Sequence, residues 1–89
     1  MNQPETTAVR DVVAELAKAR AKFGAMTSAH EGIAIIEEEF IELRNEVFWG
    51  PTDGSDAPGH VARRVAMMRA EAVQLAAMAL RFIEDVCDA

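Results

Sequence analysis

The segment from Ala70 to Ile83 constrains the fold most, because it is apolar almost all the way round and carries only two charged residues, Glu71 and Arg81. Such a segment must pack against other elements on most of its sides. A carboxylate left unpaired in that setting costs several kcal/mol or takes up a proton. Glu71 therefore needs either a positive partner or a proton.

An acidic cluster upstream supplies more negative charge rather than the missing partner. It comprises residues 37–42, with the sequence Glu-Glu-Glu-Phe-Ile-Glu, and is followed by Glu46. Bringing Glu71 near this cluster increases the repulsion unless a positive group lies among the side chains. A divalent metal ion meets that need most economically, since it prefers hard oxygen ligands and neutralises several carboxylates at once.

The composition indicates one small domain, residues 1–89, in which 51% of the residues are hydrophobic. A chain of this size has little room for a large core of its own, and association with further copies often completes the core. The net charge of -6 argues against a nucleic-acid partner, because binding to the phosphate backbone needs a basic surface. It does not oppose a nucleotide site in which a metal ion supplies the positive charge.

The sequence shows no sign of export or membrane insertion. Its first seven residues lack the basic and apolar regions of a signal peptide. The apolar stretch that ends at Ile83 has about 14 residues, fewer than the roughly 20 needed to span a bilayer. Cys87 is the single cysteine, which excludes an internal disulfide. We expect a cytoplasmic protein with no membrane partner.

Apolar residues recur at helical spacing along the chain, and no stretch alternates as a strand does. The pattern predicts an all-α protein with helices over residues 5–23, 28–49 and 60–86, a polar Gly/Pro-rich loop over 50–59 and a disordered start over 1–5. The short loop makes the second and third helices an antiparallel hairpin. We expect this hairpin and the N-terminal helix to complete a four-helix-bundle core by oligomerisation.

The second helix has a clear start and a regular apolar stripe. Ser28 and Glu31 form a Ser-x-x-Glu capping box, in which each side chain is expected to satisfy the other residue's end of the first turn. Apolar residues then follow three and four positions apart, at Ile33, Ile36, Phe40, Leu43 and Val47. This spacing predicts a helix-packing seam.

The predicted hairpin brings acids of two helices to the same depth. Glu39 lies about ten residues before the end of the second helix at Trp49, and Glu71 lies about eleven residues after the start of the third at His60. The two depths match within about 1.5 Å of helical rise. Glu42, on the same flank as Glu39, is three residues further on. We therefore expect Glu39, Glu42 and Glu71 to converge across one helix interface.

Two simpler interpretations stay open at this point. Runs of acids on helices are usually solvated faces, which is the simpler reading of Glu37, Glu38 and Glu46. Glu71 could serve a purely structural role by pairing with an arginine. The arginines available for that pairing are Arg44, Arg64 and Arg69.

Two short motifs resemble those of a known enzyme family. Residues 38–42, Glu-Glu-Phe-Ile-Glu, match the Glu-Glu-x-x-Glu signature of MazG-like nucleotide pyrophosphohydrolases, an all-α superfamily that includes dimeric dUTPases. The family carries a second motif, Glu-x-x-Asp, on the next helix. The corresponding segment here is Glu71-Ala-Val-Gln74, with 28 residues between Glu42 and Glu71. The resemblance covers roughly residues 28–86.

The resemblance implies hydrolysis of a nucleoside triphosphate between its α and β phosphates, in a homodimer or homotetramer. Carried over residue by residue, it makes Glu39, Glu42 and Glu71 ligands of magnesium, or alternatively of manganese. Glu38 or Glu46 would be a further ligand or the catalytic base that orients the attacking water. Cations are available for the substrate phosphates, although solvated charges are the simpler interpretation of each: Lys22, Arg63, Arg64 and Arg69.

Gln74 departs from the family pattern, because the family usually has Asp at this position. A glutamine carbonyl still coordinates magnesium, so Gln74 remains a candidate ligand, but it brings no charge and cannot act as a base. Asp85 lies about 16 Å further along the helix and does not easily replace it. An alternative function follows, in which the chain is a non-catalytic helical interaction module with a degenerate metal site.

Overall fold

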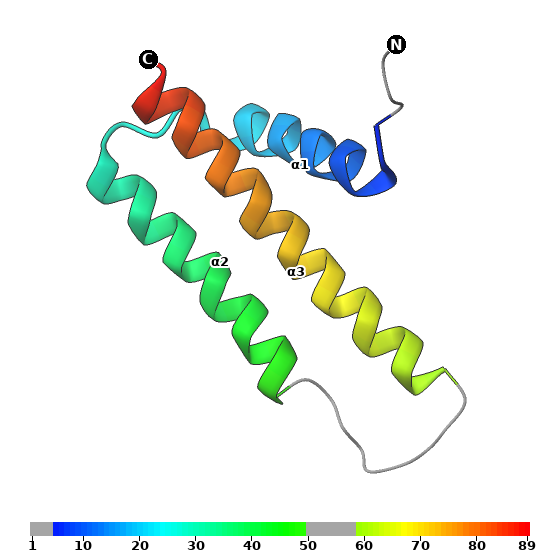
Figure 1. Cartoon of the computed structure of the whole chain (residues 1–89). Helices are drawn as coiled ribbons and strands as arrows, with labels where there is room; N and C mark the ends of the chain where they lie inside the picture. Colours follow the sequence, from blue (N-terminus) through cyan, green and yellow to red (C-terminus); the bar gives the residue numbers. More distant parts are fainter. Residues whose placement is uncertain (1–4, 50–58) are drawn as a thin grey trace.

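The computed structural model of the chain describes residues 5–49 and 59–89. These residues form three α-helices, α1 Thr7–Phe23, α2 Ala29–Trp49 and α3 His60–Phe82, followed by a π-helical turn over Ile83–Cys87 (Figure 1). No strand occurs in this part of the chain, which confirms the all-α prediction. The third helix was predicted to continue to residue 86, and the π turn occupies its last residues. The predicted disordered start and most of the predicted loop lie outside the described residues.

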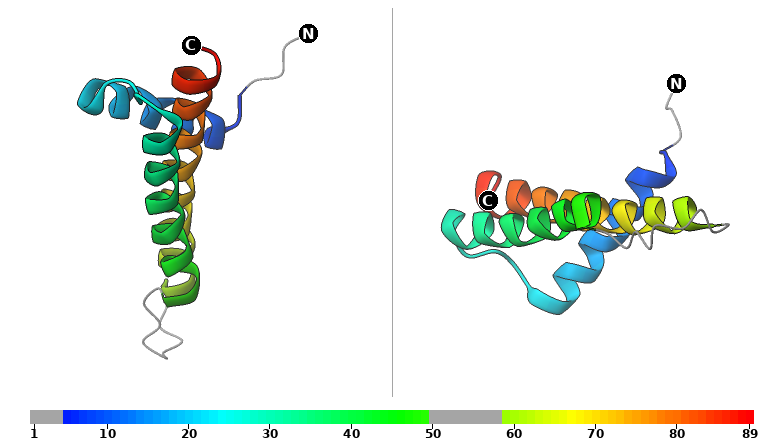
Figure 2. Two further views of the ribbon diagram at one scale, coloured as in Figure 1. Left: turned by 90° about the vertical axis from the view of Figure 1, so that its left-hand side faces the viewer. Right: turned by 90° about the horizontal axis from the view of Figure 1, so that it is seen from below.

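Helices α2 and α3 lie side by side and antiparallel, and α1 crosses α3 at a steep angle (Figures 1 and 2). The C-terminal end of α3 comes close to the segment that joins α1 to α2. The structure therefore contains the predicted antiparallel hairpin and N-terminal helix. Among the described residues, no helix combines the length and the apolar character needed to cross a bilayer.

Hydroxyl side chains cap the first two helices. The hydroxyl of Thr6 accepts a hydrogen bond from the backbone N–H of Val9 at 3.2 Å, and Ser28 does the same for Glu31 at 3.0 Å. The carboxylate of Glu31 accepts a hydrogen bond from the hydroxyl of Thr27. Ser28 thus fills the predicted capping role, while the Glu31 side chain is bound to the residue before the cap.

The core is small and lies where α1 crosses α3. Ala19 of α1 packs with Ala77 and Met78 of α3, and partly buried apolar side chains surround these three: Val12, Leu16, Ile35 and Ile36. Alanine lets the two helix backbones approach closely. The core therefore depends on the position of α1 as much as on the hairpin.

Gly32 of α2 allows a second close approach, against the aromatic ring of Phe82 near the end of α3. A Cβ atom at Gly32 would lie 2.5 and 2.8 Å from two ring carbons of Phe82, and 3.2 Å from the sulfur of Met26. Real Cβ atoms essentially never come as near to other atoms as the two distances to the Phe82 ring. The absence of a side chain at Gly32 therefore sets the distance between α2 and α3 at this end of the hairpin.

We predict that Gly32→Ala lowers the melting temperature. Alanine favours a helix over glycine by about 1 kcal/mol, but overpacking in a filled space costs about 1–3 kcal/mol. A net loss of about 1 kcal/mol corresponds to roughly 4–8 °C in a domain of this size, measurable by circular dichroism. Adding Phe82→Leu should reduce the penalty, since it removes the ring that the new methyl group meets. A melting temperature above that of the wild type would contradict the close contact.

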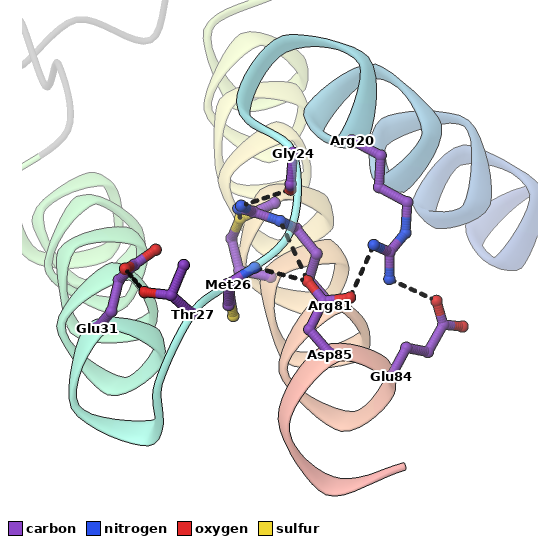
Figure 3. A network of polar contacts seen from close by, with 9 residues as sticks. Arg20, Gly24, Met26, Thr27, Glu31, Arg81, Glu84 and Asp85 are labelled. Carbon is purple, nitrogen blue, oxygen red and sulfur yellow. Dashed lines mark hydrogen bonds and ion pairs between the residues drawn. The ribbon is translucent and has the colours of Figure 1, made fainter. Parts of the chain in front are cut away.

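A polar cluster fastens the C-terminal end of α3 to the α1–α2 connection (Figure 3). The carboxylate of Asp85 accepts hydrogen bonds from the backbone N–H of Met26 at 2.9 Å and from Arg20 of α1 at 2.8 Å. Glu84 accepts a second bond from Arg20 at 2.7 Å. These bonds, first the one from Met26 and then the one from Arg20, hold the pKa of Asp85 below its ordinary value.

Arg81 completes this cluster from the buried side. Its side chain is 3% exposed, and one terminal nitrogen donates to the backbone carbonyl of Gly24 at 3.1 Å. The other terminal nitrogen contacts the sulfur of Met78 at 3.4 Å, and Nε lies 4.0 Å from Asp85. We call the group formed by Arg20, Met26, Arg81 and Asp85 the Asp85 clamp. It fixes the chain between α1 and α2, and with it the place of α1.

The apolar seam predicted on α2 is partly exposed in the single chain, although its residue Ile36 packs against the core. Ile33, Phe40 and Val47 are 48%, 52% and 42% exposed, and on α3 Val61 and Val65 are 73% and 52% exposed. We call these five residues the bare face. Its members share one flank of the hairpin by helical spacing, whereas α1 packs against another side of α3. No described element covers it.

Candidate metal centre

Three carboxylates from two helices meet at the middle of the hairpin. Glu39 and Glu42 lie one turn apart on α2, and Glu71 lies opposite them on α3. One oxygen of each carboxylate lies within 4.8 Å of the other two. The predicted convergence of these three side chains is therefore observed, because the antiparallel packing places Glu39 and Glu71 at the same depth. Their role as metal ligands stays a prediction.

The surroundings of the cluster make it costly to hold all three acids ionised. Burial, then the charge of Glu42 and a hydrogen bond with it, and then the charges of Glu71 and Glu38 raise the pKa of Glu39 to about 7. Burial also raises the pKa of Glu71, followed by the charge of Glu42, a hydrogen bond with Glu42 and the charge of Glu46. The cluster therefore holds a proton more strongly than isolated carboxylates do.

Two carboxylate oxygens in the cluster lack hydrogen-bond partners and so could coordinate a cation. Oε2 of Glu39 and Oε2 of Glu71 are both buried and have no hydrogen-bond partner. Native proteins rarely leave buried polar atoms unpaired, and such atoms call for an explanation such as a missing water or ion. Glu42 is exposed, so the cluster stays open to solvent on one side. Hard oxygen donors with an open side fit magnesium or manganese.

The arginines that could have paired with Glu71 make contacts elsewhere. Arg69 lies 2.7 Å from Asp11, Arg64 donates to the carbonyl of Val47 at 3.2 Å, and Arg44 lies over the ring of Phe48 at 5.5 Å. The structure therefore gives these three arginines partners other than Glu71. Glu71 is therefore left with a proton or another cation as the group that neutralises it.

Gln74, the fourth candidate ligand, is bound to α1. Its amide nitrogen donates a hydrogen bond to the carboxylate of Glu15 at 2.7 Å, and Lys18 lies 3.5 Å from the same carboxylate. Sequence reasoning missed this contact, because helical spacing does not reveal which face of the first helix meets the third. Gln74 therefore connects the α1 side of the site to the hairpin rather than adding a charge to the cluster.

The two candidate bases lie beside the cluster and outside the group of three. Glu38 is exposed, and its charge contributes to the raised pKa of Glu39. Glu46 is half-buried one turn beyond Glu42, and its charge contributes to the raised pKa of Glu71. Both acids thus influence the three converging carboxylates through charge. Their catalytic role stays a prediction.

We predict that the metal-free protein becomes less stable as the pH rises from 5 to 8. The pKa of Glu39 is about 7 in the folded chain against an ordinary value of 4.5. The folded state therefore binds the proton more tightly, and its stabilisation is complete below pH 4.5 and lost as the pH passes 7. A fall of about 4–8 °C in melting temperature in the presence of a chelator is expected. Glu39→Gln should flatten the profile, and an equally steep profile in that variant would refute the assignment.

The fold and the site define an all-helical chain with three converging carboxylates in a two-helix hairpin. Comparison with known protein families, with curated proteins and with solved structures finds no match. Any inference about function therefore depends on the three converging carboxylates and on the resemblance of the two motifs.

Proposed function

We propose that the chain is a metal-dependent nucleoside triphosphate pyrophosphohydrolase that releases pyrophosphate and a nucleoside monophosphate. The observation that carries the proposal is the meeting of Glu39, Glu42 and Glu71, with one oxygen of each within 4.8 Å of the others. The buried, unpartnered oxygens of Glu39 and Glu71 support it, since they lack the positive partner that a structural role would provide. The Glu-Glu-x-x-Glu spacing on α2, which includes Glu39 and Glu42, adds support through its resemblance to the signature of MazG-like pyrophosphohydrolases.

The carboxylates of Glu39, Glu42 and Glu71 would hold magnesium, and manganese is the alternative. When bound, such an ion offsets the charge of the phosphates and lowers the pKa of a coordinated water. Glu38 or Glu46 would accept a proton from the attacking water. The water oxygen forms the new bond to the α-phosphorus, and the bond from that phosphorus to the α–β bridging oxygen breaks. Pyrophosphate leaves with the bridging oxygen, and one proton passes to the base and then to solvent.

The hairpin supplies rigidity for this chemistry. Glu39 and Glu42 are fixed by α2 and Glu71 by α3, and the contact of Gly32 with Phe82 sets the distance between the two helices near one end. Ligands on helices keep their geometry better than ligands on loops. The metal centre is thus built on the most regular part of the chain.

The bare face supports a homo-oligomer, either a dimer or a tetramer. Its large apolar side chains reach 73% exposure at Val61, and no element among the described residues covers them. A second hairpin placed against the first would bury them and produce a four-helix bundle. In this proposal, a second copy of the chain would be the partner of the bare face.

The alternative function, a non-catalytic helical module with a degenerate metal site, is favoured by Gln74. This residue is uncharged and donates a hydrogen bond to Glu15, so it does not supply the carboxylate that the family usually has at this position. A magnesium-dependent rise in melting temperature separates the two functions, because an ion that binds only the native state stabilises it. A module with a lost site would show no such rise.

The deciding experiment measures pyrophosphate release from a panel of standard and modified nucleoside triphosphates. Each reaction is run with magnesium, with manganese and with an added chelator. Metal-dependent release from at least one nucleotide is expected, with loss of release in chelator. No release from any nucleotide, together with no metal-induced change in melting temperature, would refute the enzyme and leave the helical module.

A further inference from the structure

Two hollows flank Glu39 on the side of the hairpin where α1 crosses. The first has a volume of about 360 Å³ and lies between α1 and the hairpin. We call it the lysine hollow, and the residues that matter for the argument are Lys18, Lys22 and Phe23 of α1, with Glu39, Gln74 and Met78 of the hairpin. Its volume lies within the range of about 300–1,000 Å³ typical of small-molecule sites.

The second hollow has a volume of about 440 Å³ and shares Phe23, Glu39 and Met78 with the first. We call it the Ile35 hollow, because Ile35 of α2 lines this hollow and not the other. Its remaining lining residues are Glu31, Glu38 and Arg81. Glu39 is thus a wall common to both hollows and also a member of the carboxylate cluster.

The lysine hollow suits an anionic group. Lys18 and Lys22 are the two lysines of the chain, and both line it. The side chain of Lys18 is 76% exposed, and the ammonium of Lys22 lies 5.0 Å from the ring centre of Phe23. The carboxylate of Glu15 is already bound by Gln74 and contacted by Lys18. Both lysines lie at the surface and line this hollow, so their ammonium groups can reach phosphate oxygens placed near Glu39.

The Ile35 hollow suits an uncharged, partly apolar group. Ile35, Met78 and the ring of Phe23 provide apolar surface, while Glu31 and Glu38 add hydrogen-bond acceptors. Arg81 adds little positive charge to the hollow. Its guanidinium contacts the carbonyl of Gly24, the sulfur of Met78 and the carboxylate of Asp85 in the Asp85 clamp. A nucleoside matches these walls, since its base has flat apolar faces and its base and sugar carry N–H and O–H donors.

We propose that the substrate lies across Glu39 in one direction, with its pyrophosphate end in the lysine hollow and its nucleoside in the Ile35 hollow. This inference rests on the proposed pyrophosphohydrolase function. The bond to be broken lies between the α and β phosphates, and Glu39 is the wall where the two hollows meet. Lys18 and Lys22 are then binding residues for the leaving pyrophosphate, and Ile35 and Phe23 contact the nucleoside.

The two products allow the hollows to be tested separately, by calorimetric titration in the presence of magnesium. One titration uses inorganic pyrophosphate, and the other uses the monophosphate of the nucleotide hydrolysed fastest. The double variant Lys18→Ala/Lys22→Ala should weaken pyrophosphate binding by about tenfold or more and change monophosphate binding less than about twofold. Ile35→Phe, which fills the other hollow, should have the opposite pattern. Arg10→Ala removes one positive charge from an exposed position of α1 and should leave both affinities unchanged.

The lysine variant decides the outcome even if Ile35→Phe does not fold, since both lysines lie on the surface of α1. Equal weakening of both products, or a loss of monophosphate binding alone, would overturn the assignment while metal-dependent hydrolysis still supported the enzyme. Unchanged pyrophosphate binding in the double variant would overturn it in the same way. Absence of hydrolysis and of product binding in the wild type would refute the proposed function and this inference together.

Discussion

Replacing Glu71 with glutamine is expected to raise the melting temperature of the metal-free protein and to abolish its further rise with magnesium. Glutamine keeps the shape of the side chain but removes a carboxylate whose pKa is raised by burial and by Glu42 and Glu46. Relief of that repulsion should add roughly 4–8 °C in chelator at pH 8. Loss of one charged ligand should reduce pyrophosphate release on the order of 100-fold or more, because even outer contacts of a metal site are worth 10–100-fold.

Glu37→Gln is the matched control for this prediction. It makes the same chemical change on α2, at an exposed residue outside the converging group. Its melting temperature, magnesium response and turnover should equal those of the wild type. If Glu71→Gln kept the magnesium-dependent stabilisation, Glu71 would not be a ligand. If the wild type itself had no magnesium response and Glu71→Gln were merely more stable, the helical module would be the better description.

The depth match of the acids could be predicted from the sequence because it depends on local regularities. Helix ends at Trp49 and His60 follow from glycine and proline nearby, and the rise per residue of a helix is constant. Counting from those ends placed Glu39 opposite Glu71, and the structure has them together. Equal depth of this kind needs only that two helices joined by a short loop are antiparallel.

Which element covers which face could not be predicted in the same way. Helical spacing identifies residues that share a stripe, and Ile33 and Phe40 do share one, but they remain 48% and 52% exposed. The side of α2 that meets α3 instead contains Gly32 against Phe82 and Glu39 near Glu71. A glycine and an acid carry no apolar signal, so a pattern of hydrophobic residues does not reveal that contact.

The position of α1 could not be predicted from the sequence either, because it depends on contacts between residues far apart in the sequence. Arg20 and Asp85 are separated by 65 positions, and nothing in either segment indicates the other. The two hollows beside Glu39 exist only because α1 crosses at this point and brings Lys18, Lys22 and Phe23 to the hairpin. The candidate ligands were therefore predictable from the sequence, whereas the proposed substrate contacts were not.

Asp85→Ala is expected to lower the melting temperature more than Gly32→Ala does. The Asp85 side chain is 7% exposed. Its removal leaves the backbone N–H of Met26 without an acceptor, Arg20 with Glu84 alone, and the buried Arg81 without the carboxylate that lies 4.0 Å from its Nε. Buried donors without partners are strongly destabilising. A fall of roughly 10 °C or more in melting temperature is expected. Because α1 is held by this clamp, amide hydrogens near Met26 should also exchange faster with solvent.

Glu84→Ala provides the matched control, since it removes the neighbouring acid that binds the same arginine. Glu84 is 50% exposed, so its ion pair with Arg20 is screened by water and contributes little. Its loss should lower the melting temperature by about 4 °C or less. The pKa of Asp85 is lowered in the folded chain, so its stabilisation is present above the ordinary pKa and is lost as the pH falls through the folded value. The difference between the two variants should therefore narrow in strong acid. Equal losses at neutral pH would show that the clamp acts only through surface charge and does not hold α1 in place.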